Sequence, residues 1–319
     1  EDGIRALVRV RGLGELYKRQ GLVQRSLGRA ILPPLPHHND KEKTMPQTPH
    51  IAFIGAGNMA QAIIKGMLAA GYPPNKICAS GRTQAKLDQL TADTGIHTST
   101  DNLSLCDQAD VIVLGVKPHM MGDLLKSIAP AIDPSKHLIV SVAAGILAGS
   151  IDSWLGQTTP IVRCMPNTPS LVGKGAAGLF ATAGVSSAQK HTASTIMQSV
   201  GLALWVETEA HIDAVTAVSG SGPAYYFLMM EAMIAGAEEL GLSHDVAQQL
   251  VLQTAVGAAQ MAQESQQTPA QLRLAVTSPK GTTEQAIDTF NKGDFSQLCS
   301  QAMAAAHHRS EELAQLFKA

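Results

Sequence analysis

The sequence predicts an α/β protein in two parts: a mostly parallel sheet covered by helices, then an all-helical C-terminal region. Three observations support this prediction. Short apolar runs alternate with helical segments from about residue 50 onward. The run over 110–116 is almost wholly apolar, which is typical of a strand buried on both faces. After about residue 207 the strand-like runs stop, and Ala, Met and Val recur at helical spacing.

Length and composition exclude several classes of protein. The 319 residues favour two domains, and 45% hydrophobic with 16% charged residues is ordinary for a soluble enzyme. A net charge of −2 predicts no nucleic-acid partner. Four cysteines without C-x-x-C or zinc spacing predict no metal site and suit a reducing cytoplasm. The longest apolar stretch, 138–151, is too short and too interrupted for a membrane span.

Residues 1–45 differ from the rest of the chain. Their first 44 residues hold nine Lys/Arg against five Asp/Glu, and no apolar core of signal-peptide length is present. We expect a basic extension that is disordered or non-native, with Met45 as the natural start. The alternative is a basic arm that binds an anionic partner.

Residues 51–60 carry the motif around which the rest is organised. An apolar run ends in Gly-x-Gly-x-x-Ala, and a helical segment over 61–70 follows, so the context is strand, turn and helix. Gly55 allows the tight turn, Gly57 has no Cβ to block a pyrophosphate, and Ala60 lets the helix lie close to the strand. This predicts a Rossmann-like, dinucleotide-binding domain over 46–207. The predicted cofactor contacts here are Gly55, Ala56, Gly57, Asn58, Met59 and Ala60; the alternative is a glycine-rich turn with no ligand.

The remaining elements follow in order. In the first domain we predict further strands over 76–80, 95–98, 110–116, 137–143, 160–165, 179–182 and 203–206, with a helix over 82–94. In the second domain, 208–319, we predict helices over 211–240 (interrupted at 219–223), 245–263, 270–275, 283–290 and 295–318. Small residues dominate the apolar faces of these helices, which favours burial against a partner subunit.

The end of the second predicted strand indicates the cofactor. An acidic residue there would hold the ribose 2′-hydroxyl of NAD, but Ser80, Arg82 and Thr83 offer hydroxyls and a cation instead. NADPH is therefore favoured, with NADH as a weaker donor. The alternative is that Arg82 is a solvated loop cation.

Three loops follow strand ends where a ligand would lie: 115–118, 143–145 and 165–169. Backbone groups of Val116 and Lys117 could flank the nicotinamide ribose. Asn167, held between two prolines, is a candidate substrate contact. The first loop could equally be a strand terminator, and the third a stiff turn. A functional and a purely structural interpretation therefore stay open for both.

Two polar runs in the helical domain are further candidates. The run over 219–225 breaks a long apolar helix, and the run over 277–283 precedes a helix N-terminus, which suits a carboxylate. A capping box from Thr282 to Gln285 is the alternative for the second run. The helix over 212–231 contains no Lys, His or Arg, which favours C=N reduction because an iminium accepts hydride without a strong general acid.

Together these motifs resemble the pyrroline-5-carboxylate reductase family, over about 50–315. The resemblance rests on five segments in the family's order: IGAGNMA (54–60), GVKP (115–118), RCMPNTP (163–169), DAVTAVSGSGPAYYF (213–227) and VTSPKGTT (276–283). It implies an enzyme that transfers hydride from NAD(P)H to the imine carbon of 1-pyrroline-5-carboxylate. The product is L-proline, formed in the last step of its biosynthesis.

The resemblance also implies further site residues and an assembly. Asn102, Gly115, Val116 and Lys117 would contact the cofactor. The substrate carboxylate would be held by Ser278, Gly281, Thr282 and Thr283, and Thr283 would be the catalytic hydroxyl nearest the ring nitrogen. The family forms interlocked homodimers, often assembled into homodecamers (pentamers of dimers). Lys280 replaces a usual glycine, and would strain the loop if that position needs positive φ.

Two other functions remain open. One is a related NADPH reductase that acts on a different small imine or keto acid. The other is a catalytically silent regulator that binds the dinucleotide, although such a sensor has no use for a second anion site.

Overall fold

The computed structural model describes residues 48–318, so the predicted extension over 1–45 lies outside the described residues. Eight strands form one sheet in the order β3-β2-β1-β4-β5-β6-β7-β8. The strands are β1 (Ile51–Ile54), β2 (Ile77–Ser80), β3 (His97–Ser99), β4 (Val111–Leu114), β5 (Leu138–Ser141), β6 (Ile161–Met165), β7 (Gly175–Ala181) and β8 (Gly201–Trp205). All neighbouring pairs are parallel except β6 and β7. The predicted, mostly parallel Rossmann-like sheet is confirmed.

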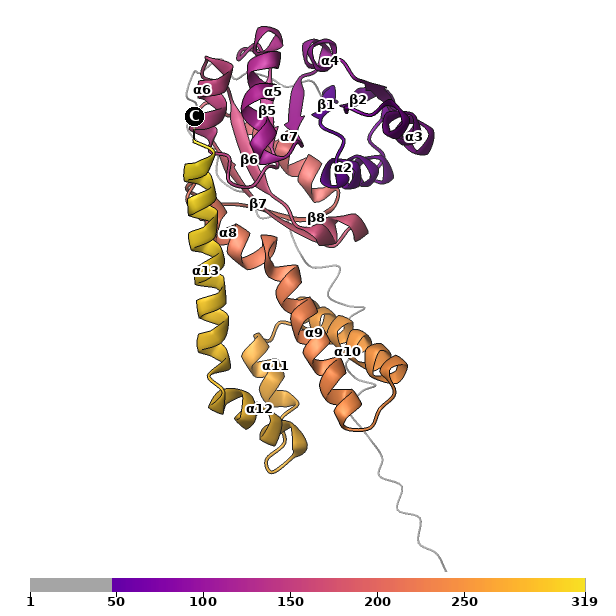
Figure 1. The fold of residues 1–319 in the computed structure, drawn as a ribbon, viewed down its shortest axis with the longest axis vertical. Helices are drawn as coiled ribbons and strands as arrows, with labels where there is room; N and C mark the ends of the chain where they lie inside the picture. Colours follow the sequence, from indigo (N-terminus) through magenta and orange to yellow (C-terminus); the bar gives the residue numbers. More distant parts are fainter. Residues whose placement is uncertain (1–47, 319) are drawn as a thin grey trace, which may run out of the picture. The chain divides into compact units, whose positions relative to one another are not determined.

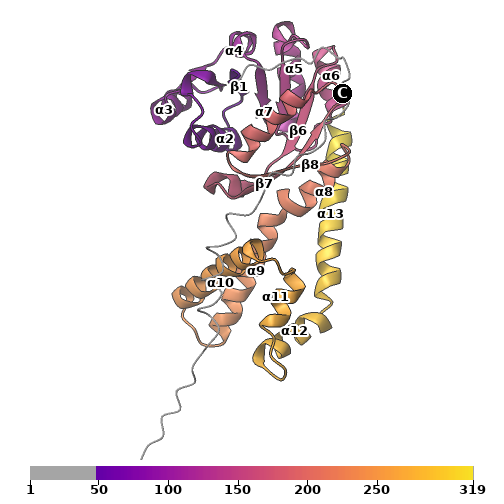
Figure 2. The same cartoon turned by 180° about the vertical axis from the view of Figure 1, so that it is seen from behind.

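Helices cover both faces of this sheet (Figures 1 and 2). One face packs against α2 (Asn58–Ala69), α3 (Gln84–Thr94) and α7 (Ser187–Gln198). The other packs against α4 (Asn102–Gln108), α5 (Met121–Ile128) and α6 (Ala148–Leu155). Short 3-10 turns connect several of these elements: Pro74–Lys76, Pro118–Met120, Ala129–Ala131 and Thr168–Val172.

The central strand β1 explains the two-faced core. Ile51 and Phe53 belong to one apolar cluster, whereas Ala52 and Ile54 belong to the other, because successive side chains of a strand point to opposite faces. All four residues are buried. A strand covered on both faces has no polar side, which is why the sequence shows an unbroken apolar run rather than an alternating one.

The strand β7 begins four residues earlier than the predicted range and reverses the sheet direction. Its register pairs Gly178 with Met165, the last residue of β6, so its first residues extend past the end of β6. Strand β8 pairs with this overhang from Gly175 onward. The early part of β7 reads GAAG, which carries little intrinsic strand preference, so the sequence did not reveal it.

The chain continues as helices after β8: α8 (His211–Val215), α9 (Gly222–Glu239), α10 (His244–Glu264), α11 (Pro269–Ala275), α12 (Thr282–Lys292) and α13 (Phe295–Leu316). Between α8 and α9 the segment Thr216–Gly220 is π-helical. The predicted interruption at 219–223 is confirmed: the π-helical segment ends at Gly220, Ser221 is a bend, and α9 begins at Gly222. Pro223 fits because it lies in the first turn of α9, where its missing N–H costs no hydrogen bond.

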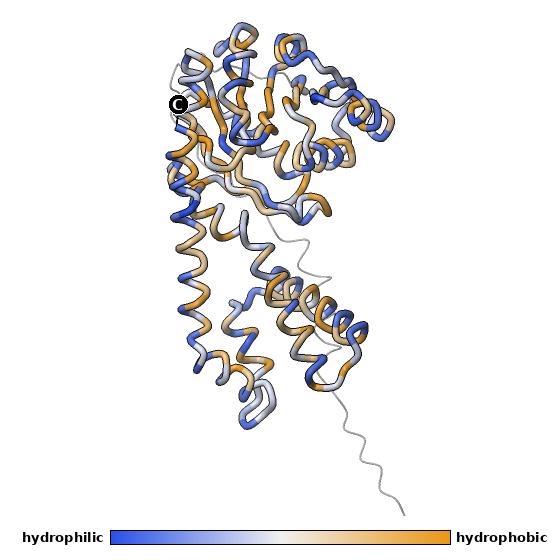
Figure 3. Tube along the Cα trace, in the orientation of Figure 1, coloured by the Kyte–Doolittle hydropathy of each residue, from blue (hydrophilic) through white to orange (hydrophobic). Residues whose placement is uncertain are grey.

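Many large apolar side chains of the helical region are exposed. Tyr226, Phe227 and Leu228 on α9 are 57–69% exposed, and Leu250 and Val256 on α10 reach 55% and 60%. Figure 3 shows apolar colour along both helices as well as in the sheet. Surfaces of this kind mark interaction sites rather than solvent-facing helix faces.

Within residues 48–318, no helix is long and apolar enough to cross a membrane. The four cysteines are free thiols, of which Cys106 and Cys164 are buried. Burial raises the pKa of Cys78 to about 11 and that of Cys106 to about 12, so both stay protonated and unreactive near neutral pH.

His137 makes stability depend on pH. Its side chain is 1% exposed, and its Nδ1 accepts a hydrogen bond from the N–H of Asp133 at 2.9 Å. Burial, followed by the nearby charge of Lys136, lowers the pKa of this imidazole. In the unfolded chain this histidine has an ordinary pKa of ~6.5. Below that pH the unfolded chain therefore binds a proton more readily than the folded chain does.

The contribution of neutral His137 to the free energy of unfolding should therefore be fully present above about pH 7. It should be lost as the pH falls below the pKa of the unfolded chain, ~6.5. Urea titrations at pH 7.5 and pH 5 measure this fall. In His137→Gln, which keeps a neutral acceptor, the fall should be smaller than in the wild type. Equal falls in both proteins would contradict the assignment to His137.

Candidate functional site

The glycine turn after β1 has the geometry that the motif predicts. Gly55 has φ of +99°, and an added Cβ would lie 2.7 Å from Cγ1 of Val116. The N–H of Ala56 donates to the carbonyl of Ser80 at 2.7 Å, which ties the turn to the end of β2. Gly57 is the N-cap of α2, and no side chain caps that helix. The first-turn N–H groups of α2 therefore have no side-chain acceptor, as an anion site requires.

A second close approach shapes the same turn. A Cβ added to Gly115, at the end of β4, would lie 2.7 Å from the carbonyl oxygen of Gly55 and 3.4 Å from Cβ of Ala60. The N–H of Gly115 donates to the carbonyl of Ile54 at 2.9 Å. Small residues at 55, 60 and 115 thus let the two strand ends and α2 meet closely.

A cavity of about 960 Å³ lies at the carboxyl ends of β1, β2 and β4. Ten predicted cofactor residues line it: Gly55, Ala56, Gly57, Ser80, Arg82, Thr83, Asn102, Gly115, Val116 and Lys117. Asn58, Met59 and Ala60 do not line it. Ala60 is buried beneath the turn, where its small size serves packing, and Asn58 and Met59 follow the turn within the first residues of α2.

Several lining residues were not predicted. Lys86 in α3, His119 after β4, and Asp123 with Ser127 on α5 belong to the cavity, together with Gly81, Leu87, Thr100, Met120 and Leu124. Lys86 follows Arg82 by four residues, and α3 has no acidic residue in its first turn. These two features of the sequence could have revealed Lys86 as a second cation of the site. The residues on α5 depend on tertiary packing, and no local signal marks them.

The cavity wall carries more positive than negative charge. Arg82, Lys86 and Lys117 line it as cations, against one carboxylate, Asp123. Arg82 and Lys86 are exposed, and neither forms an ion pair with a described residue. Two unpaired cations beside an uncapped helix N-terminus suit a phosphate dianion.

Asn167 lies outside this cavity and its amide is already engaged. Its Nδ2 donates to the carbonyl of Ser219 at 3.0 Å, and its Oδ1 accepts from the N–H of Ala176 at 2.9 Å. The side chain is buried, at 8% exposure. Asn167 thus joins the start of β7 to the π-helical segment, and its contact with substrate stays a prediction.

The loop before α12 is open at the helix N-terminus. The N-cap is Gly281, and no side chain caps it, so the alternative of a capping box from Thr282 to Gln285 is wrong. Lys280 has φ of +59°, so the position does need positive φ, and its N–H donates to Oε2 of Glu284 at 2.7 Å. An L-residue in this conformation costs about 1 kcal/mol relative to glycine.

The loop residues are not brought to the cavity within one chain. Ser278, Gly281, Thr282 and Thr283 are absent from its lining. Figures 1 and 2 both draw α12 far from β1 and β2. The two predicted halves of the site, for dinucleotide and for carboxylate, are thus separate surfaces of one subunit.

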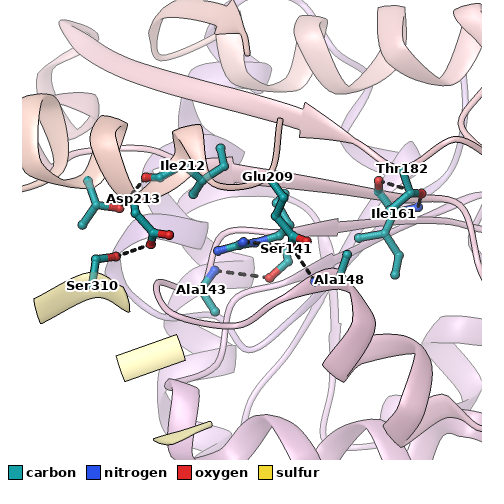
Figure 4. A network of polar contacts seen from close by, with 11 residues as sticks. Ser141, Ala143, Ala148, Ile161, Thr182, Glu209, Ile212, Asp213 and Ser310 are labelled. Atoms are coloured by element: carbon teal, nitrogen blue, oxygen red, sulfur yellow. Dashed lines mark hydrogen bonds and ion pairs between the residues drawn. The ribbon is translucent and has the colours of Figure 1, made fainter. Parts of the chain in front are cut away.

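A partly buried polar network joins the sheet to the helical region (Figure 4). Arg163 of β6 pairs with Glu209, with Nη1 and Oε1 at 2.8 Å, and the Oγ of Ser310 donates to Asp213 at 2.6 Å. Within residues 48–318, no group of three or more His, Cys, Asp or Glu is placed to hold a metal ion.

Two family models match the chain. Residues 50–145 match the family described as NADP oxidoreductase, coenzyme F420-dependent, and residues 209–313 match pyrroline-5-carboxylate reductase dimerisation.

Full-length relatives and solved structures agree with these matches. A pyrroline-5-carboxylate reductase of Pseudomonas aeruginosa is 52% identical over 84% of this chain and 98% of its own. A solved pyrroline-5-carboxylate reductase from Coxiella burnetii has a TM-score of 0.82 at 47% identity, covering 84% of this chain and 99% of its own. A pyrroline carboxylate reductase of Plasmodium falciparum, solved with NADP bound, has a TM-score of 0.74 at 30% identity, with coverages of 84% and 99%. The chain belongs to the pyrroline-5-carboxylate reductase family.

Proposed function

We propose that this protein reduces the C=N bond of 1-pyrroline-5-carboxylate to L-proline, with hydride from a nicotinamide dinucleotide. The observation that carries the proposal is the lined cavity at the carboxyl ends of β1, β2 and β4, in a chain of this family. The free thiols support a place for the reaction in the reducing cytoplasm.

The preferred cofactor in this proposal is NADPH, with NADH as a weaker donor. Arg82 and Lys86 would hold the 2′-phosphate, and Thr83, at the N-cap of α3, makes no cap hydrogen bond and leaves its hydroxyl available. No carboxylate lies at the end of β2 to repel the phosphate. The pyrophosphate would lie against Gly55, Ala56 and Gly57, at the N-terminus of α2.

The substrate site in this proposal is completed by a second copy of the chain. The loop at Ser278 and Gly281–Thr283 would hold the substrate carboxylate, but it does not line the cavity of its own subunit. The match to a dimerisation family and the exposed apolar faces of α9 and α10 support a homo-oligomer. We propose a homodimer, five copies of which can assemble into a homodecamer.

The chemistry needs positioning more than acid catalysis. The bound dinucleotide supplies the hydride, and the protein must exclude water and align the imine carbon with it. Thr283 would be the hydroxyl nearest the ring nitrogen, where its oxygen accepts the N–H of the iminium, while uncapped N–H groups of α12 would bind the carboxylate. Asn167, which holds the π-helical segment against β7, stays a candidate substrate contact in this proposal.

The proposal is tested by following NADPH oxidation at about 340 nm with 1-pyrroline-5-carboxylate, repeated with NADH. We expect rapid oxidation that yields proline, with a higher kcat/KM for NADPH. NADPH binding without oxidation would favour the regulator, and oxidation with a keto acid alone would favour the related reductase.

Substitution of Arg82 tests the 2′-phosphate site. Arg82→Ala should raise the KM for NADPH by about 10- to 100-fold, the value of one charge-assisted hydrogen bond, and should change the KM for NADH by less than about twofold. The matched control is Lys126→Ala, an exposed α5 cation outside the cavity lining, which should leave both values unchanged. A uniform loss for both cofactors in Arg82→Ala would reject this site.

Substitution of Thr283 tests the substrate loop. Thr283→Ala should lower kcat/KM for the imine by about tenfold or more and leave the Kd for NADPH unchanged, because its hydroxyl would act only on substrate. Thr289→Ala, whose hydroxyl donates within α12 to the carbonyl of Gln285, is the control and should stay near wild type. Equal losses of turnover and NADPH binding would remove Thr283 from the substrate site.

A further inference from the structure

Arg163 is a buried cation with a single ionic partner among the described residues. Its side chain is 2% exposed in the middle of β6, and its Nη1 lies 2.8 Å from Oε1 of Glu209. Its Nε is buried and has no hydrogen-bond partner within residues 48–318. A guanidinium placed this way depends on that one carboxylate for its charge compensation.

Glu209 performs a second task with the same oxygen. Its Oε1 also accepts the N–H of Ala148 at 2.7 Å, at the start of α6. The N-cap of α6, Leu147, makes no side-chain cap hydrogen bond, so Glu209 supplies the cap from 61 positions along the chain. Glu209 itself lies between β8 and α8, where the sheet ends and the helical region begins.

One carboxylate thus fixes the start of α8 to two elements of the sheet domain, as the contacts around Glu209 in Figure 4 show. The same helical path is held again further on. Val215 of α8 packs where a Cβ on Gly178 of β7 would lie, and the carbonyl of Ser219 accepts from Asn167. A Cβ on Gly220 would lie 2.6 Å from Cε of Met165, the last residue of β6, so the end of the π-helical segment lies beside the carboxyl end of β6.

We propose that Glu209 is a positioning residue for hydride transfer, acting through the bridge Arg163–Glu209–Ala148. The bridge fixes α8 and the π-helical segment against β6 and β7, so that the substrate meets the dinucleotide at a productive distance and angle. This inference rests on the proposed function. Glu209 lines no part of the cavity, so dinucleotide binding does not depend on the bridge.

The partly buried pair permits a test that separates positioning from stability. Removing Glu209 alone would strand the Arg163 charge and lower stability, which would confuse the result. The double variant Arg163→Met with Glu209→Gln removes both charges and keeps an acceptor for the N–H of Ala148. Such neutral replacements of buried pairs are often as stable as the original pair. Glu209→Asp keeps the negative charge, but its side chain is one methylene shorter, so the carboxylate lies farther from Arg163 and from the N–H of Ala148.

Wild type, the double variant and Glu209→Asp are compared with Lys65→Met as control, which breaks an exposed ion pair with Asp93 away from the bridge. The measurements are Tm, the Kd for NADPH, kcat with the imine, and the kinetic isotope effect with NADPH deuterated at the transferred position. The isotope effect reports hydride transfer itself, which a purely structural role would not change.

We expect a kcat at least about tenfold lower and a larger isotope effect in the double variant. Its Kd for NADPH should lie within about twofold of wild type, and its Tm close to the wild-type value. Glu209→Asp should show the same change to a smaller degree, which keeps the test valid if the double variant does not fold. A wild-type kcat in every folded Glu209 variant would overturn the proposal. An inactive wild type would instead reject the proposed function.

Discussion

The structure depends on a constraint at β1: a strand buried on both faces must end where a ligand's phosphates can reach its backbone. Its four side chains are divided between two apolar clusters, which fixes the helices on either side. At its end, Gly55 and Gly115 approach so closely that a Cβ on either residue would collide with the other strand end. The packing that stabilises the core therefore also forms the floor of the cavity, and a larger side chain at either position would disturb both.

Much of the nucleotide site was predictable because its signals are local. Glycine is required at fixed positions after a strand, because the backbone there has positive φ or approaches another strand end closely. Ten of the predicted contacts line one cavity. The mostly parallel sheet followed from the alternation of apolar runs and helices along the chain. Lys86 was missed although it lies only four residues after Arg82, and the residues on α5 carry no local pattern.

The remaining features arise from contacts between distant segments. The partners of Asn167 lie 9 and 52 positions away, and those of Glu209 lie 46 and 61 positions away. Nothing in a short window of sequence distinguishes a substrate amide from one that joins two elements. For the same reason, the residues of the loop before α12 predict an anion site, but they do not reveal how far the loop lies from the cavity at β1, β2 and β4.

The π-helical turn at Thr216–Gly220 has a consequence for the phase of the helix that follows. A π turn accommodates one more residue than an α turn of the same path. Deleting one residue here would turn all of α9 by about 100° about its axis, since an α-helix has 3.6 residues per turn. The exposed aromatic face of Tyr226 and Phe227 would then point elsewhere while every helix and strand kept its length. A single indel at this turn could thus change which protein surfaces recognise each other without altering the fold of one subunit.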